Sequence, residues 1–364
     1  MRALLSQAGQ AEGRLASPFP SLGIRRSALL LLAGLALGAF ALSLALGPVF
    51  IPLDEVLRIL LGGQASRETW ETIVISIRLP KAITALLAGA ALSVAGLQMQ
   101  TLFRNPLADP FILGVSSGAS LGVALVVLGG ASVSVSVFGR SALLGDFGLA
   151  SASSLGAASV FILIMAIARQ VQNVVTLLVL GLMIGYLTSA VVSLLIYFSL
   201  PEQVAAYVNW TFGSFGGVTW GQMQVFAPAL LVGLGIALAS VKPLNALLLG
   251  EGYARSMGVN VRMARWWITA SASLLAGAVT AFCGPIGFLG IAVPHLCRAL
   301  FGTSDHRILM PSAILLGGTL AILFDFISQM PGARFALPVN VITSFVGAPI
   351  VLWVVLRRQS FARV

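Results

Sequence analysis

Four side chains of types that ligate metals lie close together in this chain of 364 residues. They are its only two cysteines and its only two histidines, Cys283, His295, Cys297 and His306. Structural zinc sites pair their ligands at short spacings such as C-x2-C, but the spacing here is C-x11-H-x-C-x8-H. His295 and Cys297 also point about 200° apart if they share one helix. We therefore predict structural roles for these residues and not a metal centre.

The stretch that holds these side chains is interrupted by residues that break helices. Pro285, Gly287, Gly290 and Pro294 divide an otherwise apolar run. Inside a membrane, non-helical backbone is tolerated only where protein covers it or a cavity hydrates it. The pattern predicts a broken helix near 285–300 that packs against other helices.

The composition of the chain indicates what surrounds this stretch. Hydrophobic residues make up 58% of the chain and charged residues 9%, and the mean hydropathy is +1.01. A soluble domain carries about 25% charged residues, so this chain cannot cover itself with a polar surface. We predict an all-α polytopic membrane protein, because the apolar runs are continuous over the roughly 20 residues that a spanning helix needs.

The apolar runs and the broken stretch together predict about ten transmembrane helices. The nine clear runs lie near residues 27–47, 82–103, 111–129, 148–168, 174–200, 223–241, 263–281, 308–328 and 339–356. They define a transmembrane domain over 27–358, an N-terminal tail of 1–26 and a C-terminal tail of 359–364.

The net charge of +10 is interpreted as a topology signal and not as a sign of nucleic-acid binding. If the N-terminus is cytoplasmic and ten spans follow, fifteen of the 21 Lys and Arg residues fall inside and six fall outside. This asymmetry satisfies the positive-inside rule. We therefore predict that both tails are cytoplasmic and that no nucleic acid is bound.

The chain lacks motifs for nucleotide binding and for hydrolytic catalysis. Its two lysines, Lys81 and Lys242, follow no G-x-x-x-x-G pattern, so there is no Walker A loop. HExxH, GxSxG and paired carboxylates within one span are also absent. We predict a non-enzymatic transport protein that relies on another chain if ATP drives it. The spans hold few ionisable residues apart from Asp325, which gives little support to an ion-coupled carrier.

The segment RLPK at 78–81 precedes the second span on the outer side. Pro80 suits the first turn of a helix, where its missing N–H costs nothing. Arg78 and Lys81 have two interpretations, as interfacial anchors or as a basic pad that receives an acidic partner.

The segment TLFRNPLADPFILGVSSGAS at 101–120 lies at the inner turn between the second and third spans. Pro106 and Pro110 stop one helix and restart the next. Asn105 and Asp109 can cap the exposed backbone groups. A tight turn is sufficient to explain the stretch.

The segment KPLNALLLGEGYARSMGVNVRMAR at 242–265 is the longest inner connection. Gly250 and Gly258 are expected to end short helices, and the helix pair is suited either to docking another protein or to lying in the interface. An apolar stripe is expected from Leu244, Leu247, Leu248 and Met257.

Taken in order, these segments resemble the FecCD-type permease family, the membrane subunits of binding-protein-dependent ABC importers for iron-siderophores, haem and cobalamin. The resemblance covers the chain from about residue 50 to its end, and an ordered set is more specific than any one piece. The matching pieces are RLPK (78–81), FRNPLADPFILGVSSGAS (103–120), LLLGEGYARSMGVNV (247–261), CGPIGFLGIAVPHLCR (283–298), TSDHRILMP (303–311) and LPVNVITSFVGAPIVLWVVLRR (337–358).

The resemblance implies a homodimer in the lipid of the bacterial cytoplasmic (inner) membrane, with the channel at the dimer interface. It implies two ATPase subunits on the cytoplasmic side and a substrate-binding protein outside. No cofactor is implied for this chain, since ATP would bind the partner subunits. Residues 243–260 would form the coupling segment. Its ATPase-coupling residues would be Leu247, Gly250, Glu251, Ala254, Arg255 and Gly258.

The resemblance also implies a docking pad and two gates. The binding protein would dock on Arg78, Lys81 and Arg334. A short half-helix near 206–217 would close the outer mouth of the channel. The channel gate would comprise Asn105 and Leu107 at the inner turn and Val174 and Val175 at the start of the fifth span.

The predicted function is therefore the permease subunit of an ABC importer for a ferric-siderophore or haem. Cobalamin import is the alternative within the same family, and an ion-coupled secondary transporter is the alternative from another class. Contact with haem during passage is the alternative to a structural role for His295.

Overall fold

The computed structural model describes residues 22–129, 148–168, 174–329 and 337–361. Every regular element in these ranges is helical, which confirms the all-α prediction. In chain order the elements are α2 (Leu22–Ala45), α3 (Leu53–Leu60), α4 (Glu68–Thr72), the π-helix η2 (Ile73–Arg78), α5 (Leu79–Leu102), the 3-10 helix η3 (Pro110–Leu113), α6 (Val115–Val127), α8 (Gly148–Ala168), α9 (Val174–Phe198), α10 (Pro201–Thr211), α11 (Trp220–Ala239), α12 (Val241–Leu248), α13 (Glu251–Ser256), α14 (Val261–Cys283), α15 (Leu289–Phe301), α16 (His306–Gln329) and α17 (Val339–Phe361).

Many of these helices are suited to crossing a membrane. Among the described residues, seven helices are long and apolar enough to span it. Three shorter apolar helices accompany them, Val115–Val127, Leu289–Phe301 and Val339–Leu352. The chain is therefore a polytopic all-α membrane protein.

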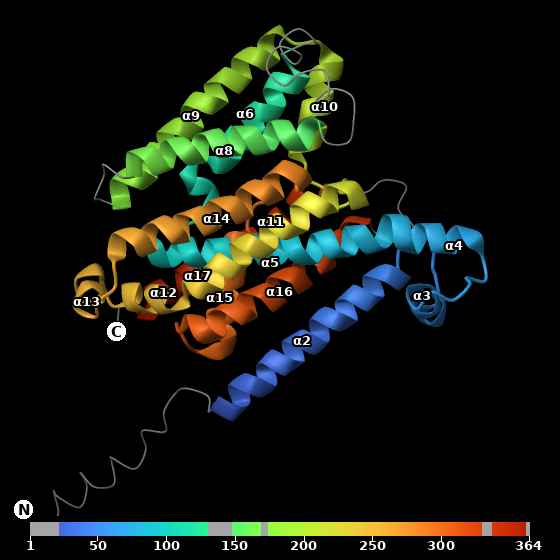
Figure 1. Cartoon of the computed structure of the whole chain (residues 1–364), viewed down its shortest axis with the longest axis horizontal. Coiled ribbons are helices and arrows are strands. Elements are labelled where there is room, and N and C mark those ends of the chain that lie inside the picture. The colour runs from blue at the N-terminus through green and yellow to red at the C-terminus, as the bar shows by residue number, and fades with distance from the viewer. Residues whose placement is uncertain (1–21, 130–147, 169–173, 330–336, 362–364) are drawn as a thin grey trace, which may run out of the picture.

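Helix α5 runs through the middle of the bundle (Figure 1) and contacts α11, α14, α15 and α16. Every residue from Ala88 to Leu102 is buried. Small residues make this burial possible, since a Cβ atom at Gly96 would collide with the backbone of Gly290 on α15. This close approach seats the helix of the broken stretch directly against α5.

Helices α6, α8, α9 and α10 form a second group beside this bundle (Figure 1). Within it α6 packs closely on α8, and α14 contacts both of them. Helix α9 buries little of its length, and Met183 and Tyr186 are among its exposed side chains. An apolar helix that is so exposed in its own chain retains surface for lipid or for a second chain.

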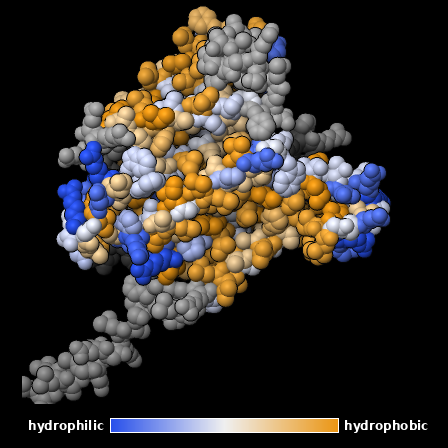
Figure 2. Space-filling view, viewed as in Figure 1, coloured by the Kyte–Doolittle hydropathy of each residue, from blue (hydrophilic) through white to orange (hydrophobic). Residues whose placement is uncertain are grey.

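Hydrophilic residues gather at two opposite ends of the molecule, with hydrophobic residues between them (Figure 2). One end carries α12, α13 and the turn between α5 and η3, and it is named here the α13 end. The other carries α3, α4 and η2, and it is named the α3 end. A hydrophobic band between polar ends matches the cross-section of a bilayer.

The two irregular features predicted from sequence are both present, one of them displaced. The half-helix expected near 206–217 is α10, Pro201–Thr211, and so begins and ends several residues earlier. Its start follows from Pro201 in the first turn and from Gln203 Oε1, which accepts from the Leu200 N–H at 3.1 Å. The broken stretch matches its prediction, because α14 ends at Cys283 and α15 begins only at Leu289.

Candidate functional site

The predicted coupling segment, residues 243–260, folds as two short helices at the α13 end. Helix α12 ends at Leu248, and Gly250, with φ 116°, turns the chain into α13. Gly258, with φ 82°, then leads the chain towards α14. Glycine is the residue that adopts such φ values without strain. These two glycines therefore end short helices, as the sequence predicted.

The apolar stripe predicted for this segment is divided between two faces. Leu244 and Leu247 are buried against the bundle, whereas Leu248 and Met257 are 41% and 59% exposed. The division arises because α12 ends at Leu248, so Met257 lies beyond a second helix with its own direction. The buried face holds the segment in place. The exposed face, to which Tyr253 also belongs, is open to a partner.

Glu251 of α13 interacts with two arginines. Its carboxylate forms an ion pair with Arg265 of α14 and lies 4.0 Å from the Arg255 guanidinium. The Arg255 side chain is 70% exposed, so this second pair contributes little to stability. Ala254 is fully buried, and its carbonyl accepts from the Val259 N–H at 3.0 Å. These contacts tie α13 to the start of α14.

The turn between α5 and η3 contains two of the predicted gate residues. Asn105 Oδ1 accepts from the Leu107 N–H at 3.0 Å, and Asp109 Oδ1 accepts from the Phe111 N–H at 2.9 Å. Both caps were predicted. Leu107 is 41% exposed at the surface of the turn. Burial raises the pKa of Asp109 to about 6, against the opposing effect of the Phe111 N–H.

Three predicted site residues cannot be placed by their side chains. Val174 and Val175 begin α9, but their side chains lie outside the described residues. Arg334 also lies outside them. Their roles as gate and docking residues stay predictions.

Two residues that the sequence did not single out connect the coupling segment to the bundle. Arg104 Nη2 donates to Leu247 O at 3.3 Å, and Asn245 Nδ2 donates to Asp305 Oδ1 at 2.7 Å. Burial alone would raise the pKa of Asp305, but the Arg307 N–H and the Asn245 amide hold it below its ordinary value. No local pattern predicts these contacts, because the partners are 143 and 60 residues apart.

The two cysteines and two histidines do not form one cluster. The His295 Nε2–H group donates to Pro106 O at 2.8 Å, while His306 bonds to other side chains near the start of α16. Cys283 and Cys297 are buried free thiols. Among the described residues, no three His, Cys, Asp or Glu side chains gather where they could hold a metal ion.

Arg78 does not lie on an exposed basic pad, which corrects that interpretation of RLPK. The residue is only 8% exposed. Its guanidinium donates to Leu44 O at 2.7 Å, to Ala45 O at 2.9 Å and to Val49 O. These carbonyls belong to the end of α2 and the turn after it, where a helix leaves acceptors without backbone partners. Arg78 therefore closes the end of α2 from within the chain.

Lys81 is also engaged inside the chain. Its Nζ lies 3.0 Å from Asp325 Oδ1, and the Lys81 side chain is 19% exposed. Gln329 Nε2 donates to the other carboxylate oxygen, Oδ2 of Asp325, at 2.7 Å. Asp325, the main ionisable residue within the predicted spans, is thus the ion-pair partner of Lys81. An acidic partner would have to compete with Asp325 for it.

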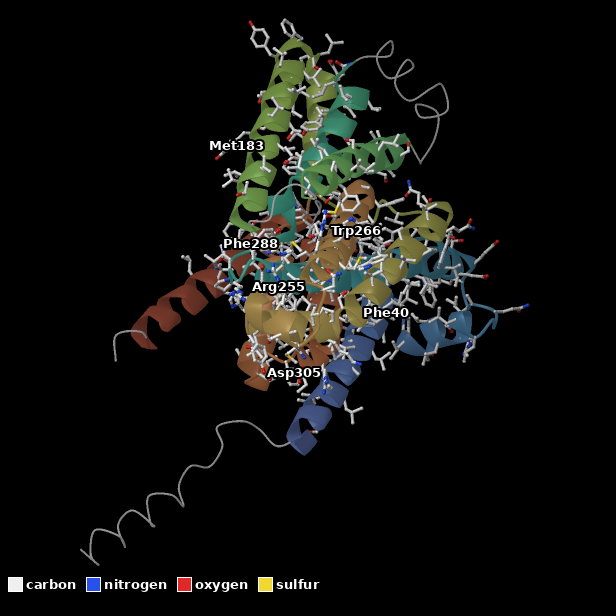
Figure 3. The ribbon with its side chains drawn as sticks, turned by 60° about the vertical axis from the view of Figure 1, so that its left-hand side comes forward. Phe40, Met183, Arg255, Trp266, Phe288 and Asp305 are labelled. Atoms are coloured by element: carbon white, nitrogen blue, oxygen red, sulfur yellow. The ribbon has the colours of Figure 1, made fainter. Side chains whose placement is uncertain are left out.

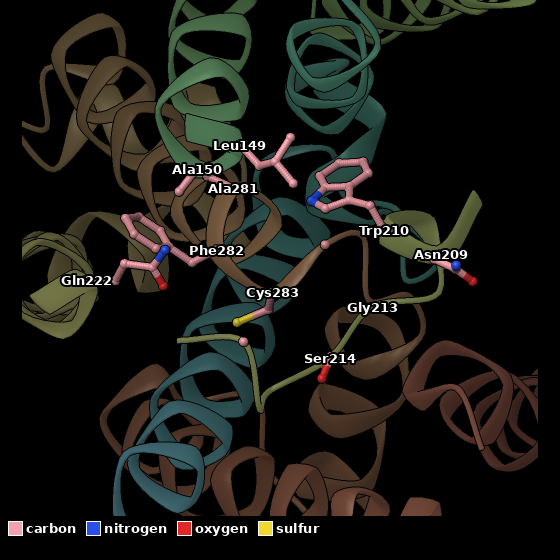
Figure 4. A pocket seen from close by; sticks show the side chains of 12 residues that line it. Leu149, Ala150, Asn209, Trp210, Gly213, Ser214, Gln222, Ala281, Phe282 and Cys283 are labelled. Carbon is pink, nitrogen blue, oxygen red and sulfur yellow. The ribbon is translucent and has the colours of Figure 1, made fainter. Parts of the chain in front are cut away.

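A cavity of about 210 Å³ lies beneath α10, at the end of α14 that is remote from α13 (Figure 4). Trp210 of α10, Phe282 of α14 and Leu149 of α8 contribute to its wall, and Cys283 lies at its edge. The last turn of the half-helix therefore borders this partly open cavity. A larger groove of about 780 Å³ runs along α17 and includes Phe345, which is exposed.

Comparison with known proteins identifies sequence relatives over nearly the whole chain. A family model described as the FecCD transport family matches residues 30–357. The vitamin B12 import system permease protein BtuC of Shigella boydii serotype 18 is 35% identical over 331 residues, which are 91% of this chain and 95% of the relative. The protein of the same name from Escherichia coli O127:H6 is 35% identical over 329 residues, which are 90% and 94% of the two chains.

A solved structure is similar in three dimensions. It is described as an inward-facing conformation of a metal-chelate type ABC transporter. The two chains are 28% identical, and the TM-score is 0.78 over 92% of this chain and 99% of that one. The structural match therefore takes in nearly the whole chain.

Proposed function

This chain belongs to the FecCD transport family and is an ABC importer permease, and from that premise we propose its orientation, its partners and its cargo. The observation that carries the proposal is the family match over residues 30–357, which includes the coupling segment, the α5–η3 turn and α10. The apolar helices and the family together indicate a multi-pass protein of the inner membrane.

The seven long and three shorter apolar helices make ten spans in the proposed topology. Both termini and the α13 end then face the cytoplasm, and the α3 end faces outwards. This orientation is supported by the distribution of basic residues, since fifteen of the 21 Lys and Arg residues fall on the inner side.

Two ATPase subunits bind the coupling segment in this proposal. The exposed side chains of Leu248, Tyr253 and Met257 offer apolar contact area, and Arg255 beside them offers charge. ATP binds and is hydrolysed on those partner chains, because this chain has no Walker A loop. Closure of the ATPase dimer displaces the segment and shifts the permease between its two access states.

Two copies of the chain form the channel. The exposed length of α9 and the groove along α17 leave apolar surface for a second copy. Asn105 and Leu107 act as the cytoplasmic gate together with Val174 and Val175 at the start of α9. The binding protein docks at the α3 end, with Lys81 and Arg334 as basic contacts, while Arg78, close to Lys81 in sequence, holds the end of α2 in place.

The proposed cargo is a bulky metal chelate, and cobalamin is the first candidate to test. The two relatives named above import vitamin B12, and the solved neighbour is of metal-chelate type. A chelate arrives with its metal already ligated, so the channel supplies shape and polarity and no ligands. A ferric-siderophore and haem belong to the same chemical class and remain predictions.

The test is co-purification of the tagged chain in mild detergent, followed by reconstitution into vesicles. We expect an ATPase subunit to be retained and hydrolysis to be stimulated by a binding protein loaded with cyanocobalamin, a ferric-siderophore or haem. Uptake of the matching labelled chelate would identify the cargo. The importer assignment would be contradicted if the chain purifies without an ATPase subunit and its vesicles accumulate none of the three chelates, whether or not ATP is supplied.

A further inference from the structure

Three side chains from three helices form a hydrogen-bonded series at the α13 end. They are Asn245 of α12, His306 at the start of α16 and Thr101 in the last turn of α5. Asn245 Oδ1 lies 2.8 Å from His306 Nδ1, and His306 Nε2 lies 2.8 Å from Thr101 Oγ1. This set is named here the 245–306–101 relay. Figure 3 labels its neighbour Asp305, at the end of the molecule that also carries Arg255.

The hydrogen-bond pattern defines the orientation of each group in the relay. Asn245 Nδ2 donates to the Asp305 carboxylate, and Asn245 Oδ1 accepts from the His306 backbone N–H at 2.9 Å. The Asn245 amide is therefore oriented, and its oxygen requires a proton on His306 Nδ1. In neutral His306, Nε2 accepts from the Thr101 hydroxyl. In protonated His306, Nε2–H donates to Thr101, whose hydroxyl then donates to Leu97 O at 3.0 Å. Both protonation states keep the contact.

Two of the three relay residues, His306 and Thr101, are shielded from water, whereas Asn245 is partly exposed, so water cannot readily replace the contact between His306 and Thr101. His306 is 1% exposed and Thr101 is 6% exposed. Arg104, three residues after Thr101, makes a second connection to α12 through Leu247 O. The end of α5 is thereby bonded to the coupling segment at two points. The gate residue Asn105 follows Arg104 directly in the chain.

We propose that His306 is a positioning residue that transmits displacement of the coupling segment to the cytoplasmic gate, using one ring nitrogen for each side. The inference rests on the proposed function, in which an ATPase moves α12 and α13. Apolar packing alone would let α12 slide over α5, because it is non-directional. A ring bonded at both nitrogens fixes the distance and direction between Asn245 and Thr101, so α12, α16 and the end of α5 move together.

Two substitutions separate the two halves of the relay. In His306→Asn the amide nitrogen replaces Nδ1 and retains the Asn245 contact, but the shorter side chain loses Thr101. In His306→Gln the amide replaces Nε2 and retains Thr101, but loses Asn245. Thr101→Val removes the same contact as His306→Asn, whereas Thr101→Ser restores the hydroxyl. The matched control is Ser312→Ala, since Ser312 is buried on the same helix and its hydroxyl donates to Ile308 O within α16.

The measurement uses the complete complex of permease, ATPase and loaded binding protein in vesicles. It records molecules imported per ATP hydrolysed, and the rate at which a maleimide labels Leu107→Cys with and without ATP. The native Cys283 and Cys297 are buried and do not compete for the reagent. We expect His306→Asn, His306→Gln and Thr101→Val each to lower the import ratio by about tenfold and to abolish the ATP-dependent change in labelling. Ser312→Ala and Thr101→Ser should behave as the unchanged protein does.

The double variant Thr101→Val with His306→Asn distinguishes the relay from general damage. Both changes remove the same contact, the one between His306 Nε2 and Thr101 Oγ1. The double variant should therefore lose no more coupled import than either single variant does. Coupled import and ATP-dependent labelling in both His306 variants, while the unchanged complex is also coupled, would overturn the relay and leave the proposed function intact. If the unchanged complex imports nothing, the proposed function itself fails.

Discussion

The two polar ends of this molecule use their charged residues in opposite ways. At the α3 end, Arg78 is bonded to three backbone carbonyls and Lys81 is paired with Asp325, so both basic groups are satisfied within the chain. At the α13 end, Arg255 is largely exposed beside exposed apolar residues of the coupling segment. Arg78 and Lys81 at the first end therefore stabilise the packing of their own chain, whereas Arg255 at the second end stays accessible.

This difference shows that a basic motif does not by itself identify a docking surface. The guanidinium of Arg78 lies where α2 has just ended, and a buried helix end needs donors for its carbonyls. The ammonium of Lys81 lies beside a carboxylate that could not be buried alone. In each case the group that needs the basic side chain as its partner belongs to a neighbouring helix of the same chain. The following predictions test the contrast between the ends, in order of expected effect.

The largest effect is expected from Gly258→Pro at the α13 end. Proline fixes φ near −65°, but Gly258 has φ 82°, so the turn between α13 and α14 cannot form. Import per ATP hydrolysed should fall by at least about tenfold, because displacement of the segment no longer reaches the bundle. Gly252→Ala is the matched control, since Gly252 is helical with open space around it. Normal coupled import in Gly258→Pro would exclude residues 243–260 as the transmitting element.

The next effect concerns the stability of the α3 end. Arg78→Leu leaves the carbonyls of Leu44, Ala45 and Val49 without their donor, so the free energy of unfolding should fall by about 3 kcal/mol. Arg58→Leu is the control on the same end, because the Arg58 side chain is 52% exposed in its pair with Glu55 and should cost less than about 1 kcal/mol. Thermal unfolding in detergent, followed with a thiol-reactive dye, measures both. If Arg78→Leu and Arg58→Leu lower the free energy of unfolding equally, the proposed contrast between buried and exposed charge is wrong.

A comparison of single and double variants tests the role of Lys81. Lys81→Met leaves the Asp325 carboxylate buried and unpaired, so it should destabilise the protein more than the double variant Lys81→Met with Asp325→Asn does. Asp325→Asn alone releases Lys81 from its ion pair. If Lys81 contacts the binding protein, this single variant should capture that protein more tightly. Unchanged capture in both single variants would confine Lys81 to a structural role.

The smallest effect is a pH dependence at the α5–η3 turn. The folded pKa of Asp109 is about 6, above its ordinary value of 3.8. The folded state therefore holds this proton more tightly, and the contribution of Asp109 to stability declines as pH rises from about 4 to about 6 and is level above that.

Asp109→Asn keeps the acceptor for the Phe111 N–H and removes the titration. The variant should be more stable than the unchanged protein at pH 7, and the difference should shrink towards pH 4. Melting temperatures at pH 4, 5, 6 and 7 provide the check. A constant difference across this range would mean that Asp109 titrates normally.

Much of the fold could be predicted because apolar length and helix-breaking residues act locally. The span predicted at 148–168 is α8, with the same limits, and the break after Cys283 lies where prolines and glycines interrupt the run. The caps at Asn105 and Asp109 were also predictable, since each side chain bonds two residues ahead. The position expected for the half-helix came from the family resemblance, whereas α10 begins earlier because Pro201 suits the first turn of a helix.

The sequence by itself determined that this chain is a helical membrane protein and that residues 243–260 form two short helices, with turns at Gly250 and Gly258. Those features depend on hydropathy, backbone conformation and motifs, which are local properties. Only the tertiary structure decided that Arg78 faces inward, that Lys81 pairs with Asp325 and that His306 joins α12 to α5. Each of these depends on which donor meets which acceptor across distant helices, and buried polar groups must find such partners wherever packing places them.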